Sequence, residues 1–130
     1  MSAAAESVAL VADDDGVIRR MLTMLLERLG YQVLLAGDGG QALRLAIAHQ
    51  PRLIFLDARM PPPDGFEVCR LLREQVPAER APVIFMVTAA GQESDRRLAA
   101  TVGVDEFLTK PFSPSKLTAR LQQLSKEAIR

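Results

Sequence analysis

Acidic residues directly follow two short apolar runs in this sequence. The triple aspartate at residues 13–15 comes after the run 8–12, and Asp57 comes after the run 53–56. If both runs are parallel strands, their carboxyl ends meet at one edge of a sheet, which is where open α/β sheets bind ligands. Carboxylates that converge there repel one another, so they raise each other's pKa or recruit a cation. The spacing therefore favours an acidic pocket that binds a metal ion.

A hydroxyl and an ammonium group follow two further apolar runs. Thr88 comes after the run 83–87, and Lys110 comes after the run 104–108. A site of oxygen ligands with few carboxylates suits Mg²⁺, which takes one or two carboxylates plus waters and phosphate oxygens. Lys110 would pair with the oxygens of a transferred phosphoryl group, and Thr88 would donate a hydrogen bond to it. Phosphoryl transfer needs these groups, with Asp57 as a nucleophile that forms an acyl phosphate.

Each of these residues also has an ordinary structural interpretation. A triple aspartate after a strand is often the N-cap cluster of the next helix. An aspartate that ends an apolar strand is often a turn residue, and Lys-Pro commonly just terminates a strand. The joint occurrence of all these residues, in this order and at the ends of alternating elements, favours the functional interpretation.

The elements that position these residues alternate between strands and helices. Continuous apolar runs indicate strands that are covered on both faces, and they occupy 8–12, 33–36, 53–56, 83–87 and, more weakly, 104–108. Amphipathic patterns predict helices at about 17–29, 40–50, 64–75, 93–102 and from 113 to the C-terminus. Strand and helix thus alternate five times, which predicts a parallel sheet with helices on both faces.

Composition narrows the class of protein. The 130 residues are 48% hydrophobic and 25% charged, which fits one globular domain. Lys+Arg and Asp+Glu both number 16, and this zero net charge argues against a chain that binds nucleic acid or an anionic membrane. The single cysteine, Cys69, excludes an internal disulfide and is expected to be buried. Because no secretory signal and no long apolar run are evident, we expect a cytoplasmic protein without a transmembrane helix.

Over about residues 8–124 the sequence resembles the receiver domains of two-component response regulators. The motifs that carry the resemblance are Leu10 to Asp15, Leu56 to Pro61 with Asp64 and Gly65, Val87 to Ala89, and Phe107 to Phe112. The resemblance implies a doubly wound α/β fold: a (βα)5 three-layer sandwich with a five-stranded parallel sheet in the flavodoxin-like order 2-1-3-4-5. We expect a single receiver domain over residues 1–130, with an ordered core at about 7–126.

The resemblance implies a role for each acidic residue. Asp57 is the implied acceptor of a phosphoryl group from a phosphohistidine on a sensor histidine kinase or a histidine phosphotransfer protein. Asp14 and Asp57 are the implied direct ligands of Mg²⁺, and Asp13 helps through water. The backbone carbonyl of Arg59 is a further implied ligand.

The resemblance also implies a switch. Thr88 moves toward the phosphoryl group once it arrives, Lys110 pairs with that group, and a cis peptide is expected before Pro111. Phe107 stands where an aromatic ring turns inward when Thr88 moves. In the family the face built by the fourth helix, fifth strand and fifth helix then carries output, often as a homodimer or toward an effector domain or protein. The alternative for this face is an ordinary solvated helix surface, and its residues here are Arg96, Arg97, Phe107 and Lys116.

Three positions depart from the commoner family pattern. Phe107 replaces tyrosine, so its ring has no hydroxyl to hydrogen-bond when exposed. Arg59 places a long cation two residues after the acceptor, and Ala90, two residues after Thr88, is too small to orient water. Arg59 could shield the phosphoryl group, so our hypothesis is slow self-dephosphorylation, which a phosphoryl half-life of seconds would contradict.

The helix expected at 17–29 carries two apolar stripes. Ile18, Leu22, Leu25 and Leu29 should face the sheet. A second stripe is either part of a wide core face or a docking surface for the helical domain of the kinase. Methionine suits a docking surface because its flexible side chain makes adaptable contacts. Its residues are Val17, Met21 and Met24.

Two other functions compete with a phosphorylation-switched module. One is a receiver that binds partners without phosphorylation. The presence of all five pocket residues argues against it, and these are Asp13, Asp14, Asp57, Thr88 and Lys110. The other is a Mg²⁺-dependent phosphatase with an aspartyl nucleophile. Such enzymes usually carry a second catalytic aspartate two residues after the nucleophile, where this chain has Arg59, and a substrate-covering cap. We therefore expect a signalling module rather than a turnover enzyme.

Overall fold

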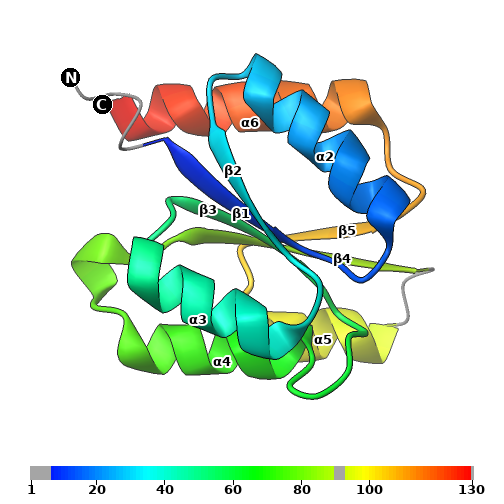
Figure 1. Ribbon diagram of the computed structural model, residues 1–130, viewed down its shortest axis with the longest axis vertical. Helices are drawn as coiled ribbons and strands as arrows, with labels where there is room; N and C mark the ends of the chain where they lie inside the picture. Colours follow the sequence, from blue (N-terminus) through cyan, green and yellow to red (C-terminus); the bar gives the residue numbers. More distant parts are fainter. Residues whose placement is uncertain (1–6, 90–92, 130) are drawn as a thin grey trace.

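A five-stranded parallel sheet lies between two layers of helices (Figure 1). The computed structural model describes residues 7–89 and 93–129. The strands are β1 (Val8–Ala12), β2 (Gln32–Ala36), β3 (Leu53–Asp57), β4 (Val83–Ala89) and β5 (Glu106–Lys110). The helices are α2 (Gly16–Arg28), α3 (Gly39–His49), α4 (Gly65–Gln75), the 3₁₀ helix η1 (Ala78–Arg80), α5 (Glu93–Val102) and α6 (Pro114–Ile129).

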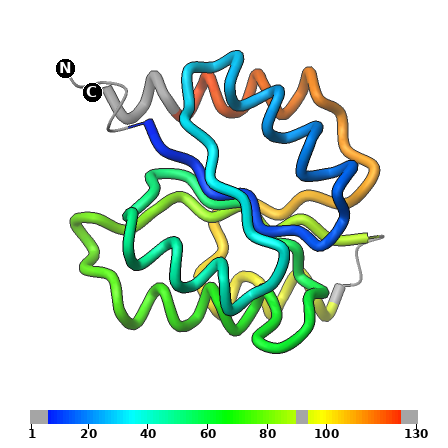
Figure 2. Tube along the Cα trace, in the orientation of Figure 1, coloured from blue at the N-terminus to red at the C-terminus, as the bar shows by residue number. Residues whose placement is uncertain are grey.

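The strand order is β2-β1-β3-β4-β5, as the resemblance implied. Strand β1 runs through the middle of the molecule between β2 and β3 (Figure 2). Helices α2 and α6 cover one face of the sheet, and α3, α4 and α5 cover the other (Figure 1). In the described part of the chain, no helix is long and apolar enough to span a membrane.

Side chains of the central strands alternate between the two faces and so build two apolar layers. In β3, Ile54 and Leu56 pack under α3 and α4, while Phe55 packs toward α2 and α6. Phe55 stacks on Phe85 of β4 with ring centroids 4.8 Å apart. Cys69 is buried in the first layer, as expected, and burial raises the pKa of its thiol to about 11.

The fifth strand is the element that the sequence placed wrongly. We expected 104–108, but β5 is Glu106–Lys110. Gly103 has a φ of +98° and follows the last residue of α5, and the Val104 amide still donates to a carbonyl of that helix. Asp105 donates its amide to the Ile84 carbonyl and accepts the Ile84 amide at its carboxylate. The polar Asp105 therefore starts the pairing with β4, and the strand extends to Lys110.

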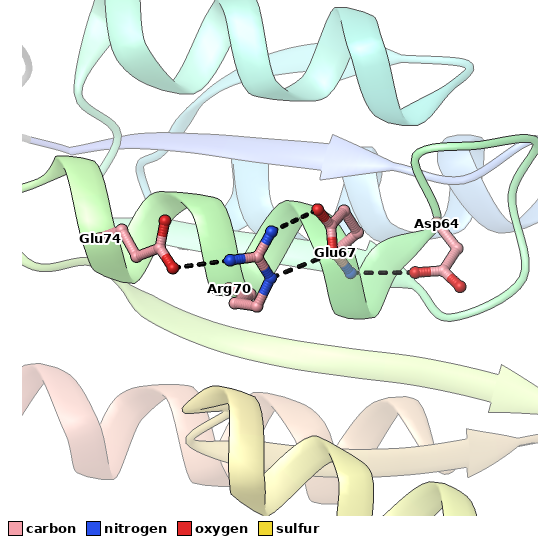
Figure 3. A network of polar contacts seen from close by, with 4 residues as sticks. All are labelled: Asp64, Glu67, Arg70 and Glu74. Carbon is pink, nitrogen blue, oxygen red and sulfur yellow. Dashed lines mark hydrogen bonds and ion pairs between the residues drawn. The ribbon is translucent and has the colours of Figure 1, made fainter.

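Three helices start from aspartate caps at the loops after β1, β2 and β3. Asp15 accepts from the amide of Val17, and Asp38 accepts from Gln41. Asp64 accepts from Glu67, on the outer face of α4 where Arg70 pairs with Glu67 and Glu74 (Figure 3). Within the triple aspartate, the capping interpretation thus holds for Asp15, which leaves Asp13 and Asp14 for another role.

Glycine lets the start of α4 approach the end of β3. A Cβ atom on Gly65 would lie 2.3 Å from the backbone oxygen of Asp57. The Gly65 amide also donates to the Ala58 carbonyl at 3.2 Å. Because no other residue lacks a Cβ, glycine at this position holds the loop after β3 close beneath the Asp57 backbone.

Candidate functional site

Three aspartates converge at the carboxyl edge of the sheet. One carboxylate oxygen from each of Asp13, Asp14 and Asp57 lies within 4.8 Å of the other two. Asp57 ends β3, and the other two follow the neighbouring strand β1. Asp13 and Asp57 are 2% and 5% exposed, whereas Asp14 is open to solvent. The cluster is therefore a half-buried acidic pocket with one side accessible.

Lys110 brings a positive charge to this pocket from the edge strand β5. Its Nζ lies 3.2 Å from Oδ2 of Asp13 and 3.7 Å from Oδ2 of Asp57. Since β4 lies between β3 and β5, the ammonium reaches across the end of one strand to do so. The Lys110–Pro111 peptide is cis, as the resemblance implied.

The hydrogen bonds in the pocket leave one buried oxygen without a partner. Oδ1 of Asp13 accepts the Asp15 amide at 2.9 Å, and Oδ1 of Asp57 accepts the Arg59 amide at 3.1 Å. Oδ2 of Asp13 has no hydrogen-bond partner among the described residues, although it forms the ion pair with Lys110. A buried carboxylate oxygen in this position can accept a cation or a metal-bound water.

Burial is the main influence on the ionisation of Asp57. It raises the pKa of this carboxyl to about 6, the Arg59 amide opposes the shift, Asp13 adds to it and Lys110 opposes it. At neutral pH the carboxylate is thus ionised but unfavourably placed, and a divalent cation would relieve the repulsion between Asp57 and Asp13.

The donor set fits a hard divalent cation such as Mg²⁺. All three converging groups are carboxylates, one buried oxygen lacks a hydrogen bond, and the exposed Asp14 leaves room for water. Such oxygen ligands suit Mg²⁺, whereas zinc favours histidine and cysteine. The only histidine, His49, is exposed at the end of α3, and the only cysteine, Cys69, is buried on α4, where its thiol donates to the Val102 carbonyl.

The two switch residues of the sequence analysis lie on β4 and β5. Thr88 is 1% exposed and follows Val87, the residue that pairs with Asp57 in the sheet. Phe107 is partly buried, and the guanidinium of Arg96 on α5 lies 4.7 Å from its ring centroid. Arg97 and Lys116 are exposed, whereas Ala90 lies outside the described residues.

The side chain of Arg59 takes an unexpected direction. Its Nη2 lies 2.7 Å from both carboxylate oxygens of Asp95 on α5, and its guanidinium is 5.9 Å from the Phe66 ring centroid. The sequence analysis missed Asp95. The helical spacing could have identified it, because Asp95 shares one stripe of α5 with Ala99 and Val102. An acidic residue on this inward stripe needs a partner when it is buried.

The predicted docking residues line a groove of about 570 Å³ between α2 and α6. Val17 and Met24 are 68% and 53% exposed, so they do not belong to a wide core face. Met21 is half-buried in the same groove, whose other side is formed by Pro114, Ser115 and Thr118.

The sequence model of the response regulator receiver domain family matches residues 9–122 of this chain. The chain is 43% identical over 115 residues to the alkaline phosphatase synthesis transcriptional regulatory protein PhoP of Bacillus subtilis, covering 88% of this chain and 47% of PhoP. It is 40% identical over 123 residues to the transcriptional regulatory protein ResD of the same organism, covering 95% and 50%. The chain thus spans about half the length of these relatives.

Solved structures of receiver proteins share the same fold. Chemotaxis protein CheY4 of Vibrio cholerae matches with a TM-score of 0.80 and 32% identity, over 90% of this chain and 97% of CheY4. The BeF3-activated DrrB receiver domain matches with a TM-score of 0.81 and 26% identity, over 92% and 97%. Because the family model matches nearly the whole chain, the protein belongs to the receiver domains of two-component response regulators.

Proposed function

We propose that Asp57 accepts a phosphoryl group from a phosphohistidine on a sensor histidine kinase or a histidine phosphotransfer protein. The observation that carries this proposal is the convergence of Asp13, Asp14 and Asp57 within 4.8 Å, with the ammonium of Lys110 paired to two of them. The whole chain, with a core at about 7–126, acts as one receiver domain in the cytoplasm.

In the transfer, a carboxylate oxygen of Asp57 forms a bond to phosphorus as the phosphorus–nitrogen bond breaks. The electron pair of the broken bond stays on the imidazole nitrogen. Lys110 pairs with the transferred oxygens, and Thr88 donates a hydrogen bond to them. Asp14 and Asp57 would hold Mg²⁺, with Asp13 acting through water and Arg59 through its backbone carbonyl. The ion would neutralise charge on the phosphoryl oxygens.

Movement of Thr88 then lets Phe107 turn inward and changes the face formed by α5, β5 and α6. This face signals to a downstream effector domain or protein, or to a second copy of the chain. The module acts as a switch rather than as a turnover enzyme, and it contacts neither nucleic acid nor membrane directly. Steady hydrolysis of a phosphate ester would instead support an aspartyl phosphatase.

Phos-tag electrophoresis after incubation with acetyl phosphate and Mg²⁺ tests the acceptor. We expect a shifted band in the wild type and none in Asp57→Asn. Absence of a shifted band in the wild type, or an equal band in the variant, would favour a receiver that binds its partners without phosphorylation.

We also propose that the groove between α2 and α6 docks the helical domain of the kinase. The exposed side chains of Val17 and Met24, beside Met21, offer an apolar surface next to the loop that carries the acidic residues. Met21→Asp should keep phosphorylation by acetyl phosphate and lose transfer from the kinase. Ile47→Asp, an exposed apolar residue on α3 in the opposite layer, should keep both.

A further inference from the structure

We propose that Asp95 is a positioning residue that holds the guanidinium of Arg59 on α5 and away from the acidic pocket. By doing so it sets the affinity of the pocket for Mg²⁺ and the lifetime of the phosphoryl group on Asp57. The second effect rests on the proposed function, whereas the first requires no phosphorylation.

The backbone of Arg59 is held at the acceptor. Its amide donates to Oδ1 of Asp57 at 3.1 Å, so the residue begins beside the acidic pocket. Its side chain is 60% exposed and could extend toward solvent, toward the pocket or toward α5. The direction of this side chain therefore depends on which anionic partner attracts it most.

Burial makes Asp95 a strong competitor for that cation. Its side chain is only 10% exposed, and Arg59 is the partner that the described residues provide for its carboxylate, at 2.7 Å from both oxygens. A buried carboxylate without a cation is highly unfavourable. The two residues are 36 positions apart, so the pair ties the loop after β3 to α5.

The acidic pocket is the competing partner. It holds three carboxylates, and among the described residues Lys110 is the cation that pairs with them. A guanidinium released from Asp95 would be attracted to this negative charge, because its backbone already lies beside Asp57. Neutralising Asp95 should thus transfer the Arg59 side chain from α5 to the pocket.

Two consequences follow from such a transfer. A guanidinium at the pocket repels a divalent cation, so Mg²⁺ should bind more weakly. On the phosphorylated protein the same guanidinium pairs with phosphoryl oxygens and occupies space that an attacking water needs, so hydrolysis should slow.

The test compares Asp95→Asn with the wild type, and the same substitution in an Arg59→Ala background. Mg²⁺ affinity is measured from amide chemical shifts in the unphosphorylated protein, and the phosphoryl lifetime from the decay of the Phos-tag band. We expect Asp95→Asn to weaken Mg²⁺ binding and to lengthen the lifetime by roughly threefold each. Neither change should appear in the Arg59→Ala background.

Two further variants separate positioning from a structural effect. Asp95→Glu keeps the charge and should restore both values toward those of the wild type. Glu74→Gln removes one carboxylate from the exposed network on α4 and should change neither (Figure 3). Amide spectra of all variants establish that they fold.

The inference is overturned if Asp95→Asn changes neither value, or if it acts equally with and without the Arg59 side chain. If the wild type takes up no phosphoryl group, the proposed function fails, and the Mg²⁺ titration alone decides the role of Asp95.

Discussion

The ammonium of Lys110 lies 3.2 Å from Oδ2 of Asp13, a buried oxygen with no hydrogen-bond partner among the described residues. In the metal-free protein this cation compensates an otherwise unpaired buried charge. Replacing Lys110 with Met should therefore destabilise the metal-free protein by about 1–3 kcal/mol at pH 7. Urea unfolding with and without Mg²⁺ measures the effect, and Mg²⁺ should restore more stability in the variant than in the wild type. An equal loss in exposed Lys116→Met would show that the pocket is not the cause.

Asp57→Asn should stabilise the metal-free protein above pH 6. Because the pKa of Asp57 is raised to about 6 in the folded protein, the folded state binds this proton more tightly than the unfolded chain does. The ionised carboxylate thus lowers folding stability as pH rises from about 4 through 6, and the deficit is complete above that range. We expect a gain of about 1–3 kcal/mol at pH 7.5 that disappears near pH 4, measured by urea unfolding.

The control for this prediction is Asp38→Asn. Asp38 is an exposed cap of α3, and asparagine caps a helix about as well as aspartate, so the change in stability should stay within about 0.5 kcal/mol at either pH. A gain from Asp57→Asn that persists unchanged at pH 4 would contradict the assignment of the effect to ionisation.

Gly65→Ala should disrupt the loop that carries the acceptor. The added Cβ would lie 2.3 Å from the Asp57 backbone oxygen, and backbone atoms cannot yield as a side chain can. We expect a loss of about 3 kcal/mol or more in thermal or urea unfolding. Gly40→Ala on α3 meets its nearest atoms at 3.5 Å and should be neutral or stabilising by up to about 1 kcal/mol. Similar losses in the two variants would refute the steric argument.

Arg73→Ala should destabilise the fold without changing Mg²⁺ affinity. Arg73 donates to the carbonyls of Gly103 and Pro82 and pairs with Asp105, which joins α4 to the amino ends of β4 and β5. Losing these bonds should lower the free energy of unfolding by about 2–4 kcal/mol. Arg70→Ala, which removes only exposed pairs on the same helix, should cost far less. A lower Mg²⁺ affinity in folded Arg73→Ala would contradict the view that contacts at the amino ends of the strands act independently of the acidic pocket at the carboxyl ends.

The positions of most strands and the convergence of the acidic residues followed from the residue pattern, whereas the order of the strands followed from the resemblance to receiver domains. Continuous apolar runs marked the strands, since parallel strands are covered on both faces. The carboxyl ends of such strands meet at one edge, so the sequence alone places Asp13, Asp14, Asp57 and Lys110 together. The error in the predicted bounds of β5 was local. Val104 is apolar, but it completes the turn after α5, and the pairing with β4 begins at the polar Asp105.

What only the tertiary structure decided is the choice of polar partners. The sequence could not divide the triple aspartate between the Asp15 cap and the pocket, because the choice depends on where α2 begins relative to β3. Nor could the sequence predict that the Arg59 side chain points away from the acceptor and pairs with Asp95, which lies 36 residues later on α5. Apolar periodicity is a local property that a sequence displays directly. Ion pairing depends on distance and burial, which arise only when separate elements pack together.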